Sequence, residues 1–326
     1  MTDFDFTILL ASIVAGAAPI VLAVLGETIS EKGGVINLSL DGSILLSAMV
    51  AFAIAYQSNN LFLGFAGGAL VGALIAAVVG FFSVSLGLSQ VAVGFVLTLT
   101  ARDLAYFLGN PYARLYGPQT GLLPIPWLQD IPVLGPILFD QSFPAYLSLL
   151  LIPFVWWYLY KTPMGLRLRA IGENPEAAYA RGTNTRSIQF WYAVAGGLLV
   201  GLAGATFSLC TKTGWGRPQG AEGTGWIALA IVIFGGWHPV KTALGAYLFS
   251  FLQIMGIHFQ GGWPSVPAQV FQVAPFPLMI FALIVMYLAQ RSSAKTSSRG
   301  SPWLRGMVRI LSGSAPAGLG RSFKPE

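Results

Sequence analysis

The chain is too poor in charge to form the surface of a water-soluble protein. Of its 326 residues, 55% are hydrophobic and only 9% are charged, whereas soluble domains carry about 25% charged residues. A helix that crosses a bilayer needs about 20 successive apolar residues, and apolar runs of this kind recur along the chain. The sequence therefore predicts an all-α, polytopic transmembrane helical bundle.

We expect about nine spans (8–10), because some of the apolar runs are short. The candidates are 7–26, 42–57, 61–86, 91–109, 143–160, 188–211, 222–235, 240–258 and 275–290. Cytoplasmic loops are enriched in Lys and Arg, and the loop 161–187 and the region after residue 290 hold most of the 18 basic residues. We therefore expect both in the cytoplasm, with the N-terminus outside and the C-terminus inside.

The chain divides into a transmembrane domain, 1–290, and a basic cytoplasmic tail, 291–326. Five apolar tail residues fall on one face of a possible helix that would lie on membrane lipid: Trp303, Leu304, Met307, Val308 and Leu311. The alternative is a disordered tail with no role. The outer loop 110–142 is rich in proline, which predicts an irregular segment that either docks an extracytoplasmic partner or lies on the headgroups.

The sequence carries no recognisable enzyme site. Its single cysteine, Cys210, excludes an internal disulfide and a Cys-ligated metal cluster, and His238 and His258 are too few for a His-ligated one. It has neither a Gly-x-x-x-x-Gly-Lys-[Ser/Thr] phosphate loop nor a His-Glu-x-x-His motif. We expect no catalytic residue, metal or cofactor in this chain. We expect no nucleic acid partner either, because no basic patch is interleaved with stacking aromatics.

Two segments interrupt the apolar runs. The first, 33–42, is mostly apolar but contains Asn37, Asp41 and three glycines, and the second, 234–239, reads Phe-Gly-Gly-Trp-His-Pro. Irregular backbone at membrane depth persists only where protein or a water-filled cavity covers it, and paired interrupted segments mark the pathway of a transporter. We predict that both segments border a translocation pathway. The alternative is two tight cytoplasmic turns.

Few charges fall within the spans, and the notable ones are Asp41, Arg102, Asp103 and Glu222. Intramembrane ionisable residues are costly and are functional suspects by default. Arg102 and Asp103 point about 100° apart on a helix, so they need not pair, and we expect a structural role for Arg102. Glu222 begins a short span, where the helix dipole favours an acid, so we expect it to cap that helix.

The loop 161–187 contains a short predicted helix. Asn174 suits the N-cap position and Pro175 the first helical position, while Gly182 suits the C-terminal stop, which predicts a helix over 175–181. Two turns are too few to be stable in water alone, so we expect a partner protein to hold this helix. The alternative is an amphipathic loop helix on the membrane surface.

The stretch from Gly165 to Gly182 resembles the coupling helix of permease subunits of ATP-binding-cassette importers. The chain is similar to the branch that contains permeases for branched-chain amino acids, simple sugars and nucleosides. Residues 26–42 resemble its early Gly-Val-x-Asn-Leu-Gly-x-Glu-Gly run, with Ser39 and Asp41 where Gly and Glu are common. Residues 85–94 resemble its third-to-fourth-span turn, and 225–239 resemble Gly-Phe-Ile-Ala-Leu-Ala-x-x-Ile-Phe-Gly-x-Trp-x-Pro, a form most similar to nucleoside-type permeases.

The resemblance implies a transport subunit rather than an enzyme. It implies two ATP-binding-cassette ATPase subunits that carry ATP and Mg, a sister permease in a heterodimer, and an extracytoplasmic solute-binding protein. It also implies a multi-pass protein of the plasma (inner) membrane of a prokaryote. On this basis the residues that couple to the ATPases are Gly165, Arg169, Gly172, Glu173, Asn174, Pro175, Ala177, Ala178 and Gly182.

The solute expected from this resemblance is a nucleoside, moved by alternating access. The candidates for lining its path are polar or aromatic residues that suit contact with a base or ribose: Asn37, Asp41, Gln90, Thr98 and Trp226. For each of them, packing or a turn is the alternative role. The alternative solutes are a simple sugar and a branched-chain amino acid. The alternative from another class is a stand-alone secondary transporter with its own coupling-ion site.

Overall fold

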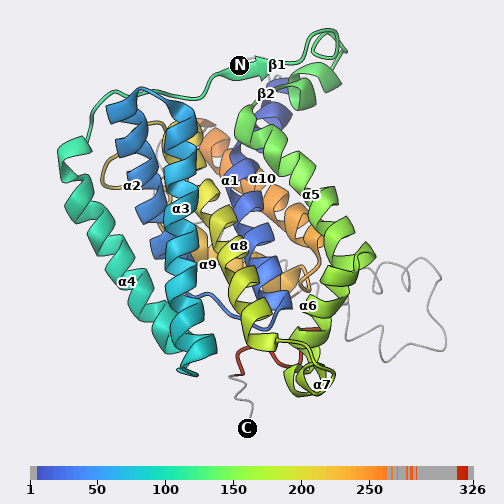
Figure 1. The fold of residues 1–326 in the computed structure, drawn as a ribbon. Helices are drawn as coiled ribbons and strands as arrows, with labels where there is room; N and C mark the ends of the chain where they lie inside the picture. Colours follow the sequence, from blue (N-terminus) through green and yellow to red (C-terminus); the bar gives the residue numbers. More distant parts are fainter. Residues whose placement is uncertain are drawn as a thin grey trace, which may run out of the picture.

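The computed structural model of the chain describes residues 6–262, the isolated residues 266, 270, 277, 280, 281 and 284, and residues 314–321. This part of the chain is almost entirely helical (Figure 1). The long helices are α1 Phe6–Lys32, α2 Leu40–Ser58, α3 Leu61–Gly80, α4 Gln90–Gly109, α5 Phe143–Lys161, α8 Thr185–Thr206 and α10 Pro239–Gly262. The shorter ones are α6 Pro163–Glu173, α7 Pro175–Ala180 and α9 Thr224–Phe234.

Eight of the predicted spans coincide with helices, but the expectation of nine is not confirmed. Seven helices of the described residues are long and apolar enough to cross a membrane. Helix α9 has 11 residues, and at about 1.5 Å per residue it is about half as long as a bilayer core of about 30 Å. The predicted span 275–290 lies largely outside the described residues. The polytopic helical class is therefore confirmed, with a half-length helix in place of the seventh predicted span.

Helix α1 lies inside the bundle, between α8 and α10 (Figure 1). Every residue from 17 to 28 is buried, as expected for a helix that is apolar on nearly all sides. On the other side of α8, helix α3 approaches so closely that a Cβ on Gly72 would lie 2.3 Å from the carbonyl oxygen of Gly197. Small residues at such a crossing allow the dense packing that holds helices together in lipid.

The loop 110–142 and the loop 161–187 lie at opposite ends of the bundle (Figure 1). The end of the bundle formed by the loop 110–142 is called the hairpin end below. This loop contains the short helical turns η2 Asn110–Tyr112 and η3 Gly135–Phe139. The loop also contains two three-residue strands, β1 Leu122–Pro124 and β2 Asp140–Ser142, which pair antiparallel with Leu122 opposite Ser142. The opposite end of the bundle, called the α6–α7 end below, is formed by the helices α6 and α7 of the loop 161–187. The prediction of an irregular 110–142 loop with short structured pieces is confirmed.

The described piece of the tail, 314–321, lies at the α6–α7 end (Figure 1). Its backbone donates hydrogen bonds from Gly318 to the Gly172 carbonyl at 2.8 Å and from Gly320 to the Gly34 carbonyl at 3.1 Å. The tail and the loop 161–187 are therefore on one side, as the charge pattern predicts, and this piece is ordered against the bundle. The predicted lipid-facing stretch 303–311 lies outside the described residues.

The α3–α8 crossing gives a test of the fold. Replacing Gly72 with Val puts side-chain atoms where the backbone of Gly197 and Gly201 already lies, and overpacking of this kind costs about 1–3 kcal/mol. We expect Gly72→Val to lower the thermal unfolding temperature of the purified protein in detergent. The matched control is Gly121→Val, because a Cβ at Gly121 meets no atom within 4 Å. Equal stability of the two variants would contradict the packing described here.

Candidate functional site

The first interrupted segment, residues 33–39 between α1 and α2, is irregular backbone buried within the bundle. Helix α1 ends at a turn in which Gly34 has φ +88°, a left-handed conformation that favours glycine. The Gln90 side chain of α4 accepts a hydrogen bond from the Ile36 N–H at 2.8 Å, and the Gln189 side-chain amide of α8 donates to the Gly33 carbonyl at 2.9 Å. Two other helices thus supply partners for this backbone.

The side chains of Glu27 and Thr98 also bind backbone groups of this segment. The Asn37 N–H donates to Oε1 of Glu27 at 3.0 Å, and the Thr98 hydroxyl donates to the Leu38 carbonyl at 2.7 Å. Buried backbone groups without a partner are costly, so these side chains are what permits an irregular segment here. The contacts run along α4 from Gln90 to Thr98, which corresponds to a depth of about 12 Å at about 1.5 Å per residue. The segment therefore enters the bundle and is not a surface turn.

The end of this segment meets the start of the half-length helix α9. Oδ1 of Asp41 accepts a hydrogen bond from the Gly225 N–H at 3.2 Å, and a Cβ on Gly225 would lie 2.2 Å from the Asp41 nitrogen. The carboxylate thus faces the positive end of the α9 dipole, well inside the bundle. Trp226, the next residue, leaves 40% of its surface exposed.

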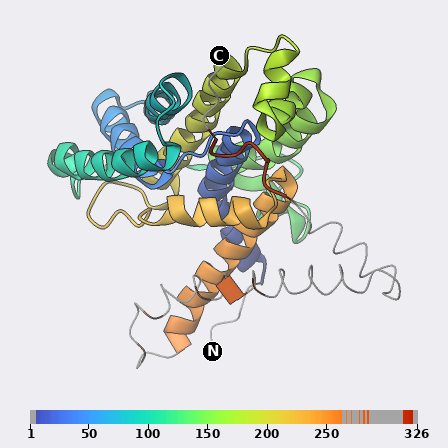
Figure 2. The same ribbon diagram turned by 90° about the horizontal axis from the view of Figure 1, so that it is seen from below.

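The second interrupted segment joins α9 to α10, which runs in a clearly different direction (Figure 2). Trp237 in this turn has φ +55°, and its indole N–H donates to the buried carboxylate of Glu31. Glu31 and Glu27 lie one turn apart on the same face of α1. Through these two side chains of α1, both interrupted segments are tied to the same helix.

Glu27, Glu31 and the neighbouring Lys32 were not expected inside the bundle, because the apolar run that predicts the first span stops at residue 26. Helix α1 continues to Lys32, and all three side chains are buried. The signal that could have revealed the pair is its spacing. Residues four apart lie on one face of a helix, directly before a segment whose backbone needs partners.

The structure gathers four of the five predicted path residues around the first interrupted segment. Asn37, Asp41, Gln90 and Thr98 are each less than 10% exposed, and all four take part in hydrogen bonds with backbone groups. Trp226 lies beside them and is the one with a substantial exposed surface. Their contacts show what they anchor, and their role in lining a path stays a prediction.

Glu222 does not cap α9, contrary to our expectation, because the helix begins only at Thr224. Its carboxylate accepts hydrogen bonds from the N–H groups of Gln219 and Gly220, both at 2.6 Å, and from the hydroxyl of Tyr106 on α4. Burial raises the pKa of Glu222, but these hydrogen bonds outweigh it and hold the pKa below the usual glutamate value. Glu222 thus closes the loop 212–223 and fastens it to α4.

Arg102 and Asp103, which need not pair as neighbours on a helix, contact each other through Nε and Oδ1 at 3.4 Å. Their side chains remain 44% and 73% exposed. The guanidinium of Arg217, from the loop 212–223, lies 4.7 Å from the centre of the Tyr106 ring one turn further along α4. The C-terminal half of α4 is therefore bordered by charged and aromatic groups from two parts of the chain.

The predicted short helix of the loop 161–187 is confirmed as α7, Pro175–Ala180. Oδ1 of Asn174 accepts the Ala177 N–H at 3.0 Å as the N-cap, and Gly182 follows the helix with φ +81°. Of its small side chains, Ala177 is exposed, whereas Ala178 is only 9% exposed and packs inside the chain. Ala178 is therefore not part of an outward docking face.

Helix α6 is held tightly against the bundle. A Cβ on Gly165 or on Gly172 would lie 2.2 Å from the carbonyl oxygen of Tyr158 or of Lys32, respectively. Nε of Arg169 donates to the Leu159 carbonyl at 3.0 Å. At the end of α6, the exposed side chain of Glu173 accepts the N–H of tail residue Ala317 at 3.2 Å. These residues fix the position of α6, while α7 projects from it.

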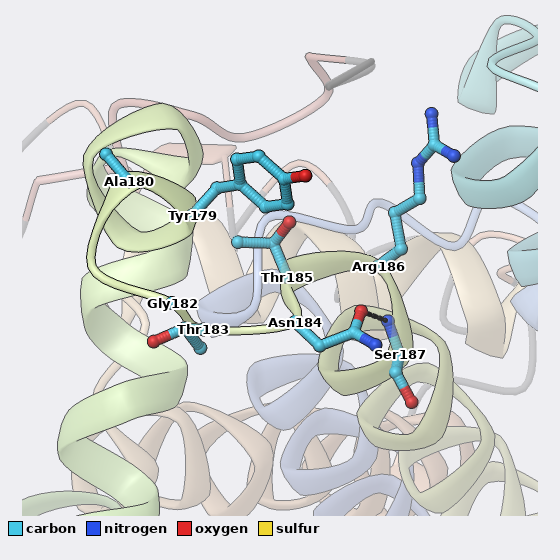
Figure 3. Close-up of a pocket in the computed structure, with 8 residues that line it drawn as sticks. All are labelled: Tyr179, Ala180, Gly182, Thr183, Asn184, Thr185, Arg186 and Ser187. Carbon is cyan, nitrogen blue, oxygen red and sulfur yellow. Dashed lines mark hydrogen bonds between the residues drawn. The ribbon is translucent and has the colours of Figure 1, made fainter. Parts of the chain in front are cut away.

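An open hollow of about 900 Å³ lies where α7 turns into α8, lined by residues 179, 180 and 182–187 (Figure 3). Tyr179 and Arg186 extend on its two sides with Thr185 between them (Figure 3). Nε of Arg186 is buried and has no hydrogen-bond partner among the described residues. The hollow is open and lies next to α7, so it suits a protein contact better than a solute site.

Comparison with known proteins gives a consistent picture. Residues 9–289 match the family described as branched-chain amino acid transport system / permease component. The chain is 36% identical to the putative glucose ABC transporter permease protein TsgC13 of Haloferax volcanii over 77% of this chain and 78% of the relative. It is 31% identical to the nucleoside ABC transporter permease protein NupC of Lactococcus lactis over 86% and 92% of the two chains. It is 30% identical to the guanosine ABC transporter permease protein NupQ of Bacillus subtilis over 89% and 94%. No solved structure matches the chain.

Asp41 allows the link between α2 and α9 to be tested. Asp41→Ala removes the acceptor of the Gly225 N–H, and an unsatisfied buried donor costs about 1–3 kcal/mol. We expect this variant to unfold at lower temperature and to lose transport, whereas Asp41→Asn keeps an oxygen acceptor and is affected less. Thermal unfolding and solute uptake are measured for both variants. If Asp41→Ala behaves like the unchanged protein, the carboxylate does not hold these two helices together.

Glu222 predicts a pH dependence of the loop 212–223. A carboxyl group whose pKa is lowered in the folded state stabilises that state above its unfolded pKa, and the stabilisation disappears as the pH falls through the lowered value. We therefore expect hydrogen exchange in this loop, corrected for the intrinsic rate, to increase at acidic pH. In Glu222→Gln the loop should be looser at neutral pH and less sensitive to acid. A loop that stays equally protected across this range would contradict the role of Glu222.

Proposed function

The chain belongs to the family of branched-chain amino acid transport system permease components, and we propose that it moves nucleosides through the membrane. It is the membrane-spanning subunit of an ABC importer. The observation that carries the solute proposal is the similarity to NupC and NupQ over 92% and 94% of their own lengths. The motif from Gly225 to Pro239, which resembles the nucleoside-type form, supports it.

A simple sugar is the second candidate solute. It is favoured by the 36% identity to the Haloferax relative named as a glucose permease. Nucleosides and sugars share a hydroxylated ring of similar size, so a path that admits one suits the chemistry of the other. A branched-chain amino acid carries both a carboxylate and an ammonium group and would need different contacts.

We propose that two ATPase subunits, which carry ATP and Mg, dock on α7 and on the adjoining hollow. The support is the geometry of the α6–α7 end: α7, with 6 residues, projects from α6 and leaves Ala177 exposed beside the hollow. A sister permease and an extracytoplasmic binding protein complete the proposed importer. In this arrangement the α6–α7 end faces the cytoplasm and the hairpin end faces outward, in the inner membrane of a prokaryote.

The proposed mechanism is alternating access driven by the ATPases. Movement of α7 passes to α6, and Gly172 of α6 is in direct contact with the Lys32 carbonyl at the end of α1. From there the interrupted segment 33–39 leads to Asp41 and, through its hydrogen bond, to the start of α9. Asn37, Gln90 and Thr98 would keep this segment in one conformation while the helices around it move.

Reconstitution tests the proposal. The chain is co-purified with its membrane-bound partners, placed in proteoliposomes with ATP inside, and supplied with binding protein and labelled guanosine, glucose or leucine. We expect ATP-dependent uptake that is fastest for the nucleoside. Faster uptake of glucose would favour the sugar alternative, and uptake by the chain alone without an ATPase would support a secondary transporter.

Variants at the surface address the docking of the ATPases. Ala177→Trp places a bulky group on the exposed side of α7, and we expect it to abolish ATP-dependent uptake while the chain still inserts and folds. Ala66→Trp makes the same change on the exposed side of α3 and serves as the control. Normal uptake with Ala177→Trp would remove α7 from the interface with the ATPases.

A further inference from the structure

The Arg102–Asp103 pair lies at a place where charges are most costly. Helix α4 and the turn after it form a span from Gln90 to Tyr112. At about 1.5 Å per residue, both residues lie within about 3 Å of the middle of this span along its axis. Yet the two side chains are 44% and 73% exposed. Charged side chains at the middle of a bilayer do not face lipid, so either water or another protein covers them.

The contact between Arg102 and Asp103 uses only a small part of the hydrogen-bonding capacity of the two side chains. The Nε–Oδ1 distance of 3.4 Å is long for an ion-paired hydrogen bond, and no other hydrogen bond of either side chain occurs among the described residues. A guanidinium offers five N–H donors and a carboxylate about four acceptor positions. Most of this capacity is therefore directed away from the chain, toward whatever covers this side of α4.

The neighbours of Arg102 one turn away along α4 are polar, whereas those of Asp103, Leu99 and Phe107, are exposed apolar residues. One turn before Arg102, Thr98 holds the Leu38 carbonyl, and one turn after it, Tyr106 donates to Glu222. Thr98 also lies directly against Gly42, next to Asp41, which binds the start of α9. Arg102 thus lies between the buried interrupted segment and the loop 212–223, on the side of α4 that leads to a half-length helix of the kind that borders midplane solute sites.

We propose that Arg102 and Asp103 contact the transported solute and bind its vicinal hydroxyl groups. This inference rests on the proposed function, because both the ribose of a nucleoside and a simple sugar present such hydroxyls. The Asp103 carboxylate accepts two O–H groups, and the Arg102 guanidinium donates to the hydroxyl or ring oxygens. Trp226, the exposed aromatic at the start of α9, offers a flat surface for the ring of the solute.

Cysteine labelling tests whether water reaches the pair. Cys210 is the only cysteine of the chain, so Cys210→Ser provides a background in which Asp103→Cys is the single thiol. In the assembled importer, we expect this thiol to react with a membrane-impermeant, charged methanethiosulfonate reagent, and we expect excess solute to slow the reaction.

Leu104→Cys is the matched control. Leu104 is at nearly the same depth and is 40% exposed, but it points about 100° further around the helix than Asp103 and away from Arg102. We expect its thiol to react at least about tenfold more slowly, because a charged reagent enters lipid poorly. If Asp103→Cys is as unreactive as Leu104→Cys in every state of the importer, a partner subunit covers the pair and the inference is wrong.

A second experiment tests the hydroxyl contact itself. Uptake of guanosine and of its 2′,3′-dideoxy analogue is compared at concentrations that saturate the binding protein with each. We expect Asp103→Asn to slow uptake of guanosine about tenfold, as for loss of a hydrogen bond to a charged group, and uptake of the analogue by less than about twofold. Equal slowing of both solutes would overturn the assignment.

Two further measurements keep the outcome unambiguous. If Asp103→Asn leaves Arg102 uncompensated and the importer does not assemble, the electrically neutral double variant Arg102→Gln, Asp103→Asn is tested with the same pair of solutes. If the unchanged importer transports glucose and not guanosine, the comparison is made with glucose and 2-deoxyglucose. Only if neither class is transported does the proposed function fail, and that result is independent of the Asp103 variants.

Discussion

The structure depends on keeping an irregular stretch of backbone inside an apolar bundle. In lipid no water is present to bind free N–H and C=O groups, so each must find a partner in the protein. Residues 33–39 meet this requirement with side chains from three other helices or helix ends: Glu27 of α1, Gln90 of α4 and Gln189 of α8. The positions of these helices relative to one another are consequently fixed where the segment lies.

The same constraint explains the acids of α1. Glu27 and Glu31 are buried, and their spacing of four residues places both carboxyl groups on one face of the helix. Each carboxyl group accepts one hydrogen bond, Glu27 from the backbone of Asn37 and Glu31 from the indole of Trp237. The pair therefore links the two interruptions, which are about 200 residues apart in the chain.

The sequence allows the helices to be predicted because apolar length is a property of the chain itself. It also reveals the interruption at 33–42, through its glycines, and the helix α7, through Asn174 and Pro175. It does not reveal that Gln90 and Thr98 bind the backbone of 36–38, because those contacts join residues more than 50 positions apart. The prediction that Glu222 caps α9 is wrong for a related reason. The helix-dipole rule considers α9 alone, whereas the carboxylate of Glu222 accepts hydrogen bonds from Tyr106 and from the backbone of the loop 212–223.

The close contacts of α6 decide how movement can reach the interrupted segment. Because Gly172 leaves no space for a side chain between α6 and the Lys32 carbonyl, a shift of α6 cannot be absorbed by rotation of a flexible group. The tail adds a second connection, since its backbone joins Gly172 to Gly34 through Gly318 and Gly320. In the proposed mechanism, a displacement at α7 would therefore be transmitted backbone to backbone to the start of the segment 33–39. The hydrogen bond from Gly225 to Asp41 would then carry it to α9, so these contacts form one continuous connection between the α6–α7 end and the half-length helix.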